Sequence, residues 1–235
     1  MTPLAEAIAG VRARIDAACS LVGRDPAGVR LLAISKTHAL PILVHAVAAG
    51  CTQLGESRVQ EVVEKARGWS SAADGLPAPE WVLIGHLQRN KVRDVASLVA
   101  EFQALDSLEL AEALDRRLQA AGRGLRVLVQ VNTSGEASKF GLAPDEVVDF
   151  ARRLSPFSSL VVDGLMTIAT RSDDPADADA CFTTLRELQT RLRDEAVLGS
   201  SWDELSMGMS GDLEQAIAHG STTVRVGTAI FGRRG

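Results

Sequence analysis

The sequence predicts one α/β domain over residues 1–235, a (β/α)₈ barrel of the TIM type with an extra N-terminal helix. Three observations predict it: short apolar segments alternate with amphipathic ones eight times, the apolar segments are almost continuously apolar, and the chain has 235 residues. Continuous apolar strands are typical of a parallel sheet covered by helices. Eight strand–helix units in this length match a closed barrel. The alternative is an open doubly wound sheet, but no Gly-x-Gly-x-x-Gly follows the first strand.

The first units begin with a helix over 4–22, where apolar residues recur at helical spacing. A short apolar strand follows at 30–35. Pro41 fits the first turn of a helix and Gly50 fits its end, so we expect a helix between them.

The next units contain a weak strand at 52–55 and a helix at 57–67. Residues 68–79 are rich in Gly, Ser, Ala and Pro, which predicts a loop. The third strand is expected at 81–85, and a helix at 90–99.

The middle of the chain continues the alternation. A strand at 101–105 precedes a helix at 108–121. The run 125–131 is rich in β-branched residues, which favours a strand, and a helix is expected at 144–154.

The last units follow the same order. A strand at 160–165 leads to a long helix at 176–195, and a short strand at 204–206 leads to a helix at 212–219. The eighth strand is expected at 222–226.

Composition excludes several classes of protein. The three cysteines, Cys19, Cys51 and Cys181, are far apart and form no Cys-x-x-Cys pair, which predicts free thiols in a reducing compartment. No signal peptide and no apolar run of ~20 residues is visible. The net charge of −5 gives no basic footprint for nucleic acid. We expect a soluble, cytoplasmic protein.

Lys36 is the best candidate for a reactive amine among the four lysines. It directly follows the first strand, where burial at a barrel mouth lowers the pKa of an amine and frees it to attack an aldehyde. The alternative is that Lys36 extends into solvent. Lys65 forms an i,i+4 pair with Glu61 that is typical of a solvated helix face, and Lys91 and Lys139 lie in a basic turn and a loop.

The segments around the last two strands suggest an anion site. Ser210 and Gly211 are expected to begin a helix, whose free N–H groups favour an anion. Gly227 permits close backbone approach and Thr228 adds a hydroxyl donor. Alternatively, Ser210 only caps its helix and Gly227 only turns the chain; the acidic Asp212 suits that alternative.

Arg225 is the remaining candidate, because it lies inside an apolar strand where an unpaired guanidinium is costly. It requires either a carboxylate partner or an acceptor on a ligand, and the sequence leaves both open. The four histidines share no metal-ligand spacing. His86 is noted only because it follows the third strand, where barrel side chains can face the mouth. No Ser-His-Asp order is present, so no metal and no catalytic triad is expected.

Six motifs carry a resemblance to a known family. They are 32–37, 54–61, 84–91, 164–168, 205–210 and 224–232. In this order they resemble the motifs of the pyridoxal phosphate homeostasis protein family, from about residue 30 to the C-terminus. Two positions depart from the family pattern: Ser57 stands where Asn is usual, and Val82 where His is usual.

The resemblance implies a fold similar to the N-terminal barrel of bacterial alanine racemase without that enzyme's second domain. It implies pyridoxal 5′-phosphate (PLP) as the cofactor, a Schiff base on Lys36, phosphate binding by Ser210, Gly227 and Thr228, and Arg225 facing the pyridine nitrogen. The cofactor-binding residues expected on this basis are Lys36, Ser206, Ser210, Arg225, Gly227 and Thr228.

Three functions share these residues: a cofactor carrier, an amino-acid racemase and an aldolase-like enzyme. Racemisation requires a base on each face of the substrate, and alanine racemase takes one, a tyrosine, from a second domain. This chain contains no tyrosine and ends directly after the last barrel strand. An arginine at the pyridine nitrogen also weakens the electron sink. We therefore expect a carrier and buffer of PLP with little or no turnover, with apo PLP-dependent enzymes as its acceptors, and the resemblance implies a monomer.

Overall fold

The computed structural model describes residues 2–73, 75–170, 172 and 174–232. Its strands form a closed parallel barrel in which each strand pairs with the next and β8 pairs with β1. The strands are β1 Arg30–Ile34, β2 Gln53–Glu56, β3 Glu80–Leu83, β4 Val99–Leu105, β5 Leu125–Val131, β6 Leu160–Thr167, β7 Glu204–Ser206 and β8 Thr223–Val226. The predicted fold class is confirmed, and the open sheet is excluded.

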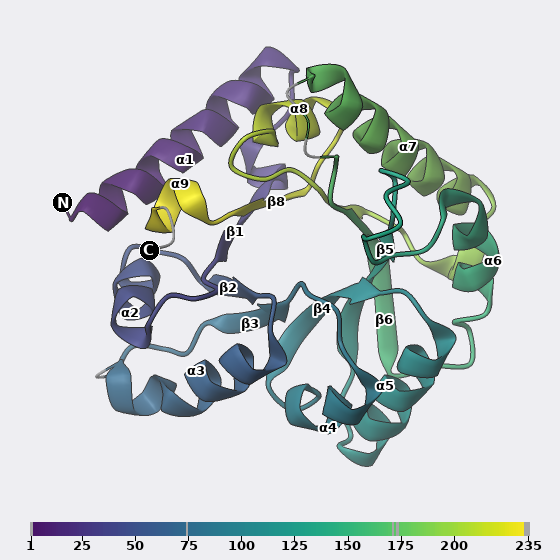
Figure 1. Cartoon of the computed structure of the whole chain (residues 1–235), viewed down its shortest axis with the longest axis horizontal. Coiled ribbons are helices and arrows are strands. Elements are labelled where there is room, and N and C mark those ends of the chain that lie inside the picture. Colours follow the sequence, from purple (N-terminus) through teal and green to yellow (C-terminus); the bar gives the residue numbers. More distant parts are fainter. Residues whose placement is uncertain (1, 74, 171, 173, 233–235) are drawn as a thin grey trace.

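Helices surround the barrel (Figure 1). The α-helices are α1 Pro3–Leu21, α2 Leu40–Ala48, α3 Val59–Ala72, α4 Val92–Val95, α5 Leu108–Ala120, α6 Val147–Arg152, α7 Pro175–Asp194, α8 Leu213–Ala218 and α9 Thr228–Phe231. Four 3₁₀ turns join them: η1 Pro26–Gly28, η2 Arg89–Lys91, η3 Pro144–Glu146 and η4 Val197–Gly199. The extra helix α1 packs against α8 and α9 (Figure 1).

Two predicted elements are wrong in extent. The helix expected at 57–67 begins at Val59 and continues to Ala72, into the predicted loop, because buried Trp69 packs edge-on against Trp81 of β3. The helix expected at 90–99 is only η2 and the single turn α4. It ends early because Val99 already pairs with Trp81 as the first residue of β4.

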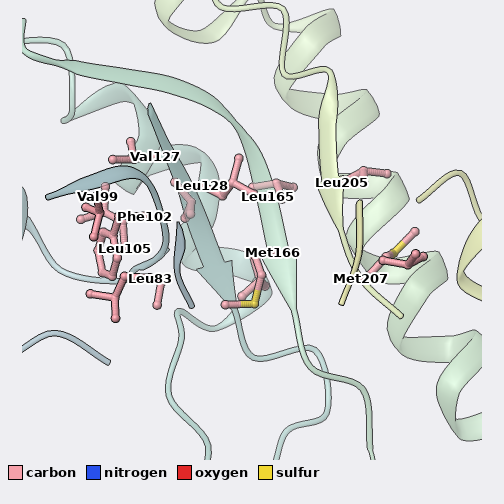
Figure 2. Packing of buried hydrophobic residues seen from close by; sticks show 14 of the residues in the cluster. Leu83, Val99, Phe102, Leu105, Val127, Leu128, Leu165, Met166, Leu205 and Met207 are labelled. Atoms are coloured by element: carbon pink, nitrogen blue, oxygen red, sulfur yellow. The ribbon is translucent and has the colours of Figure 1, made fainter. Parts of the chain in front are cut away.

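Side chains alternate across each strand and so form two apolar layers. The main cluster lies between strands and helices, and Figure 2 shows part of it, including Phe102, Leu128, Leu165 and Met207. A separate small cluster of Leu32, Ile34 and Val82 fills the inside of the barrel near β1. Val82, where the family has His, therefore makes this part of the interior apolar. A Cβ on Gly55 would lie 2.5 Å from Cδ1 of Ile34, so glycine in β2 makes room for the inner cluster.

Charged side chains close the N-terminal end of the barrel. Glu101 of β4 is 2% exposed and accepts hydrogen bonds from both Nη atoms of Arg30, at 2.8 and 2.9 Å. Arg126 lies 3.6 Å from Glu101 and also pairs with Asp163. Burial alone would raise the pKa of Glu101, but the bonds from Arg30 outweigh it and hold that pKa below its usual value. The opposite, C-terminal end carries the predicted site residues, as in other barrels of this type.

Candidate functional site

Lys36 lies in the turn between β1 and α2, at the C-terminal end of the barrel. It comes two residues after Ile34 of the inner cluster and is half-buried. The next residue, Thr37, has a φ of +69°, in the left-handed region that non-glycine residues rarely adopt. The turn therefore requires support from its surroundings.

That support is a charged network formed by Lys65 and Glu61 of α3 with buried Glu56 of β2. The ammonium group of Lys65 donates to the carbonyl of Ser35 at 2.9 Å, to Glu56 Oε1 at 2.7 Å and to Glu61 Oε2 at 3.0 Å. The Lys65 side chain is 8% exposed, so the prediction of a solvated Glu61/Lys65 pair is wrong. The spacing correctly indicated that the two residues interact, but spacing alone does not tell which helix face is turned toward the barrel.

The two carboxylates of this network differ. Burial raises the pKa of Glu56, although Lys65 and Ser35 hydrogen-bond to its Oε1. Among the residues that the structure describes, the buried Oε2 of Glu56 has no hydrogen-bond partner. Burial would also raise the pKa of Glu61, but the hydrogen bonds from the Thr37 N–H and from Lys65 outweigh it, so the pKa of Glu61 is lowered.

Arg225 of β8 is buried inside the barrel and 3% exposed. Its Nη1 donates to Ser206 Oγ at 2.8 Å and its Nη2 to the carbonyl of Thr167 at 2.7 Å. Ser206 Oγ donates in turn to Gln103 at 2.7 Å. Within residues 2–232 as described, no carboxylate lies within 4.0 Å of Arg225, so the first alternative for its partner is not found.

The charge of Arg225 survives this burial. Burial lowers the pKa of Arg225 to about 10, with Asp212 acting in the opposite direction. The guanidinium is therefore still a cation at neutral pH, held by neutral partners only. Such a group favours an electron-rich acceptor on a ligand.

The end of β8 lies directly beside the end of β1. Ala33 pairs with Val226, and a Cβ on Gly227 would lie 3.2 Å from the carbonyl oxygen of Ile34. Thr228 begins α9 and is exposed. The closure of the barrel thus brings Gly227, at the end of β8, against the end of β1, two residues before Lys36.

Ser210 is placed differently from the prediction. It does not begin α8, because Asp212 accepts the N–H of Met209 and the helix starts only at Leu213. Instead, the Oγ of Ser210 accepts the N–H of Ala229 at 3.4 Å. Ser210 therefore joins the β7–α8 loop to α9, next to Gly227 and Thr228. The prediction that Ser210 and Gly211 begin a helix is wrong, and so is the alternative that Ser210 caps it.

A second group of side chains borders the same end of the barrel. His86, after β3, stacks on Phe140 at a ring-centroid distance of 4.2 Å, and its Nδ1 lies 3.9 Å from Asp106. Burial raises the pKa of Asp106, with His86 acting in the opposite direction. Lys139 donates to the carbonyl of Ala169 at 2.9 Å. Apart from His86, no sequence pattern indicated this group, because its members are far apart along the chain.

Other classes of site find no support. In the described ranges no three His, Cys, Asp or Glu side chains are grouped as metal ligands require. Within those ranges, no helix is both long and apolar enough to span a bilayer. Cys19, Cys51 and Cys181 are free and buried, as predicted.

Known proteins are similar to this chain over its whole length. The family model for the alanine racemase N-terminal domain matches residues 9–235. The pyridoxal phosphate homeostasis protein of Pseudomonas aeruginosa is 43% identical over 234 residues, covering 100% of this chain and 97% of that protein. The protein of the same name from Vibrio cholerae is 41% identical, covering 100% and 98%.

Solved structures show the same similarity. A protein from Bifidobacterium adolescentis superimposes with a TM-score of 0.90 at 38% identity, covering 97% of this chain and 94% of that one. PipY of Synechococcus elongatus, solved with PLP bound, gives 0.82 at 33% identity, covering 97% and 100%. Alanine racemase of Streptomyces coelicolor gives 0.70 at 23% identity over 58% of its length, which indicates a shared fold. On this evidence the chain belongs to the pyridoxal phosphate homeostasis protein family, built on the alanine racemase N-terminal fold.

Proposed function

We propose that this chain binds PLP as a Schiff base on Lys36 and acts as an intracellular carrier and buffer of the cofactor. The observation that carries the proposal is the arrangement of Lys36, Gly227 and Arg225 at one end of the barrel. Lys36 is half-buried beside the end of β8, and the buried cation Arg225 is held by neutral partners. The PLP-bound structure of PipY, a relative at 33% identity, supports the same ligand.

The residues fit the parts of PLP. Gly227 lets the turn after β8 lie closely against Ile34 at the end of β1, so the backbone N–H groups of this turn can donate to a phosphate there. Thr228 and Ser210 supply hydroxyl groups from the same turn and the neighbouring loop. Arg225 is assigned to the pyridine nitrogen, to which it can donate a hydrogen bond. Ser206 already binds both Arg225 and Gln103, so under this proposal it orients Arg225 and supports cofactor binding through it.

The chemistry of the bound cofactor is limited by Arg225. PLP supplies an aldehyde that condenses reversibly with a primary amine and releases water. Because Arg225 stays protonated well above neutral pH, it would act as the donor to a pyridine nitrogen placed beside it, and that nitrogen would carry no proton of its own. This weakens the electron withdrawal that racemisation requires. The lack of tyrosine in the chain also supports storage and transfer over turnover.

Mapping of the reduced adduct tests the binding site. The purified protein is incubated with PLP, treated with borohydride and digested, and the pyridoxyl group is located by mass spectrometry. We expect it on Lys36, and we expect Lys36→Ala to lose it. Lys65 serves as an internal control, because its ammonium hydrogens are fully bonded. An adduct that avoids Lys36 in the parental protein would refute the proposed site.

Transfer experiments test the carrier role. Protein loaded with PLP is mixed with an apo PLP-dependent enzyme, and recovery of that enzyme's activity is followed against free PLP at the same concentration. We expect faster or more complete activation from the loaded protein. Equal activation by free PLP would contradict the carrier role but not the binding of PLP. We also propose that the protein is a monomer and is cytoplasmic. Sedimentation of the loaded protein tests the oligomeric state, and cell fractionation tests the location.

A further inference from the structure

Both peptide groups that flank Lys36 are bound by the same helix. On one side, the carbonyl of Ser35 accepts a hydrogen bond from Lys65 Nζ at 2.9 Å. On the other side, the N–H of Thr37 donates to Glu61 Oε2 at 2.6 Å. The direction of a residue's Cα–Cβ bond is set by its two flanking peptide planes. These two bonds therefore fix the direction in which the Lys36 side chain leaves the backbone.

Thr37 shows that the turn is held under strain. Its φ of +69° is a conformation that β-branched residues disfavour because Cβ crowds the backbone. The hydrogen bond from its N–H to Glu61 offsets that cost. Without Glu61, the turn is free to relax toward the ordinary region, which rotates the peptide after Lys36.

Lys65 and Lys36 have opposite roles despite their identical chemistry. An ammonium group has three hydrogens, and Lys65 uses all of them, on Ser35, Glu56 and Glu61. Its side chain is 8% exposed. With its hydrogens engaged in these bonds, the Lys65 amine is not available to an aldehyde, and its contact with the Lys36 turn is through the carbonyl of Ser35.

Glu56 indicates that this network serves more than folding. Its side chain is completely buried, and in the described part of the chain its Oε2 has no hydrogen-bond partner. A buried carboxylate oxygen without a partner is unfavourable for stability. Proteins retain such groups where function requires the arrangement.

We propose that Lys65 and Glu61 are positioning residues that hold the Lys36 turn in the orientation required for its amine to condense with an aldehyde. We name Lys65, Glu61 and Glu56 the α3 clamp. This inference rests on the proposed function, and it assigns a role to residues outside the cofactor pocket. The clamp leaves the cofactor itself untouched and acts through the two peptide groups of Lys36.

The test removes the bond to Thr37 and then restores the turn by another route. In Glu61→Ala, we expect the imine absorbance band to form about tenfold more slowly with PLP, because misplaced reacting groups lose rate steeply. Glycine adopts positive φ without steric cost, so Thr37→Gly in the same chain should recover most of the lost rate. Glu64→Ala is the matched control, because Glu64 lies on the exposed face of the same helix. We expect Glu64→Ala and Thr37→Gly alone to stay within about twofold of the parental rate.

Two results would overturn the inference. One is a parental rate in Glu61→Ala. The other is a slow Glu61→Ala variant that Thr37→Gly fails to rescue, which would indicate a general loss of structure. Amide hydrogen exchange at Thr37, measured without PLP, gives an independent readout: Glu61→Ala should increase it and Glu64→Ala should leave it unchanged. If PLP fails to react at Lys36 in the parental protein, the proposed function fails, and exchange at Thr37 still decides whether the clamp exists.

Discussion

Arg225 carries its charge in a part of the barrel that solvates it poorly. The lowering of its pKa to about 10 by burial corresponds to about 3 kcal/mol of unfavourable free energy for the charged form. Ser206 and Thr167 compensate part of the lost hydration with neutral hydrogen bonds. A protein under selection for stability alone would place an apolar residue there. A hydrogen-bond acceptor on a bound ligand would offset this free-energy cost.

Arg225→Met should separate stability from binding. We expect the unliganded variant to unfold at the same temperature as the parental protein or higher, because a buried charge is replaced by an apolar side chain of similar length. PLP binding should weaken by about ten- to a hundredfold, the loss of one charge-assisted hydrogen bond. Thermal unfolding without ligand and absorbance titration with PLP measure the two effects. A large fall in melting temperature with unchanged affinity would show that Arg225 is structural.

Gly227 is the second residue whose role depends on the space around it. A Cβ there would lie 3.2 Å from the Ile34 carbonyl oxygen and 3.4 Å from the Ile34 Cβ, so a larger side chain would push the turn after β8 away from the end of β1. We expect Gly227→Val to weaken PLP binding by about a hundredfold, since backbone donors could no longer approach the phosphate. Gly28→Ala is the control, because nothing lies within 4 Å of a Cβ at Gly28. Equal affinities in the two variants would place the phosphate elsewhere.

At the scale of one element, α3 combines two tasks. Its Trp69 packs on Trp81 and holds the helix against β3. Earlier in the same helix, Glu61 and Lys65 hydrogen-bond to the backbone on either side of Lys36. The helix therefore transmits the packing of the outer layer to the backbone beside the proposed reactive lysine.

The energetics of the α3 clamp can be measured with a double-mutant cycle. Lys65→Met leaves Glu56 buried without its cation, so we expect a loss of about 3–5 kcal/mol in the free energy of unfolding. Glu56→Gln in the same chain removes that stranded charge and should recover at least half of the loss. Urea denaturation of the parental protein and the three variants gives the coupling. Additive effects of the two substitutions would mean that Lys65 and Glu56 do not interact as the geometry indicates.

For the whole molecule, acid stability depends on the network at the N-terminal end of the barrel. Burial opposes ionisation of Glu101, but Arg30 outweighs it and the folded-state pKa lies below 4.5. The unfolded state then binds more protons, so this contribution is complete above about pH 4.5 and is lost as the pH falls through the folded pKa. Glu56 has the opposite sign: its pKa is raised, and its contribution decreases as the pH rises above 4.5.

We therefore expect the melting temperature to fall as the pH decreases below about 4.5. Glu101→Gln should lower the melting temperature at pH 7 and flatten the acid side of the profile, because the titrating group is gone. The exposed Glu64→Gln should leave the whole profile unchanged. If Glu101→Gln kept the parental dependence of melting temperature on pH, acid unfolding would be due to other carboxylates. Calorimetric scans between pH 3 and pH 7 make the comparison.

Much of the proposed site was predictable because its residues follow strands. Lys36 comes after β1 and Gly227 after β8, and the ends of parallel strands meet at one end of a barrel. The α3 clamp was missed for a physical reason: a Glu–Lys pair at i,i+4 has the same sequence signature whether its helix face is solvated or buried. The helix ending at Ala72, beyond the predicted Arg67, shows the same limit, since the contact of Trp69 with Trp81 is a tertiary one.

The sequence by itself determined the order of strands and helices, the barrel, the family and the identity of the candidate lysine. These follow from local periodicity and from motifs, which the chain carries before it folds. Only the tertiary structure decided that Arg225 has neutral partners, that Ser210 binds Ala229 rather than capping α8, and that Lys65 binds the carbonyl of Ser35 beside Lys36. Each of these depends on which side chains the closure of the barrel brings together. That is set by packing between elements distant in sequence, which no local pattern encodes.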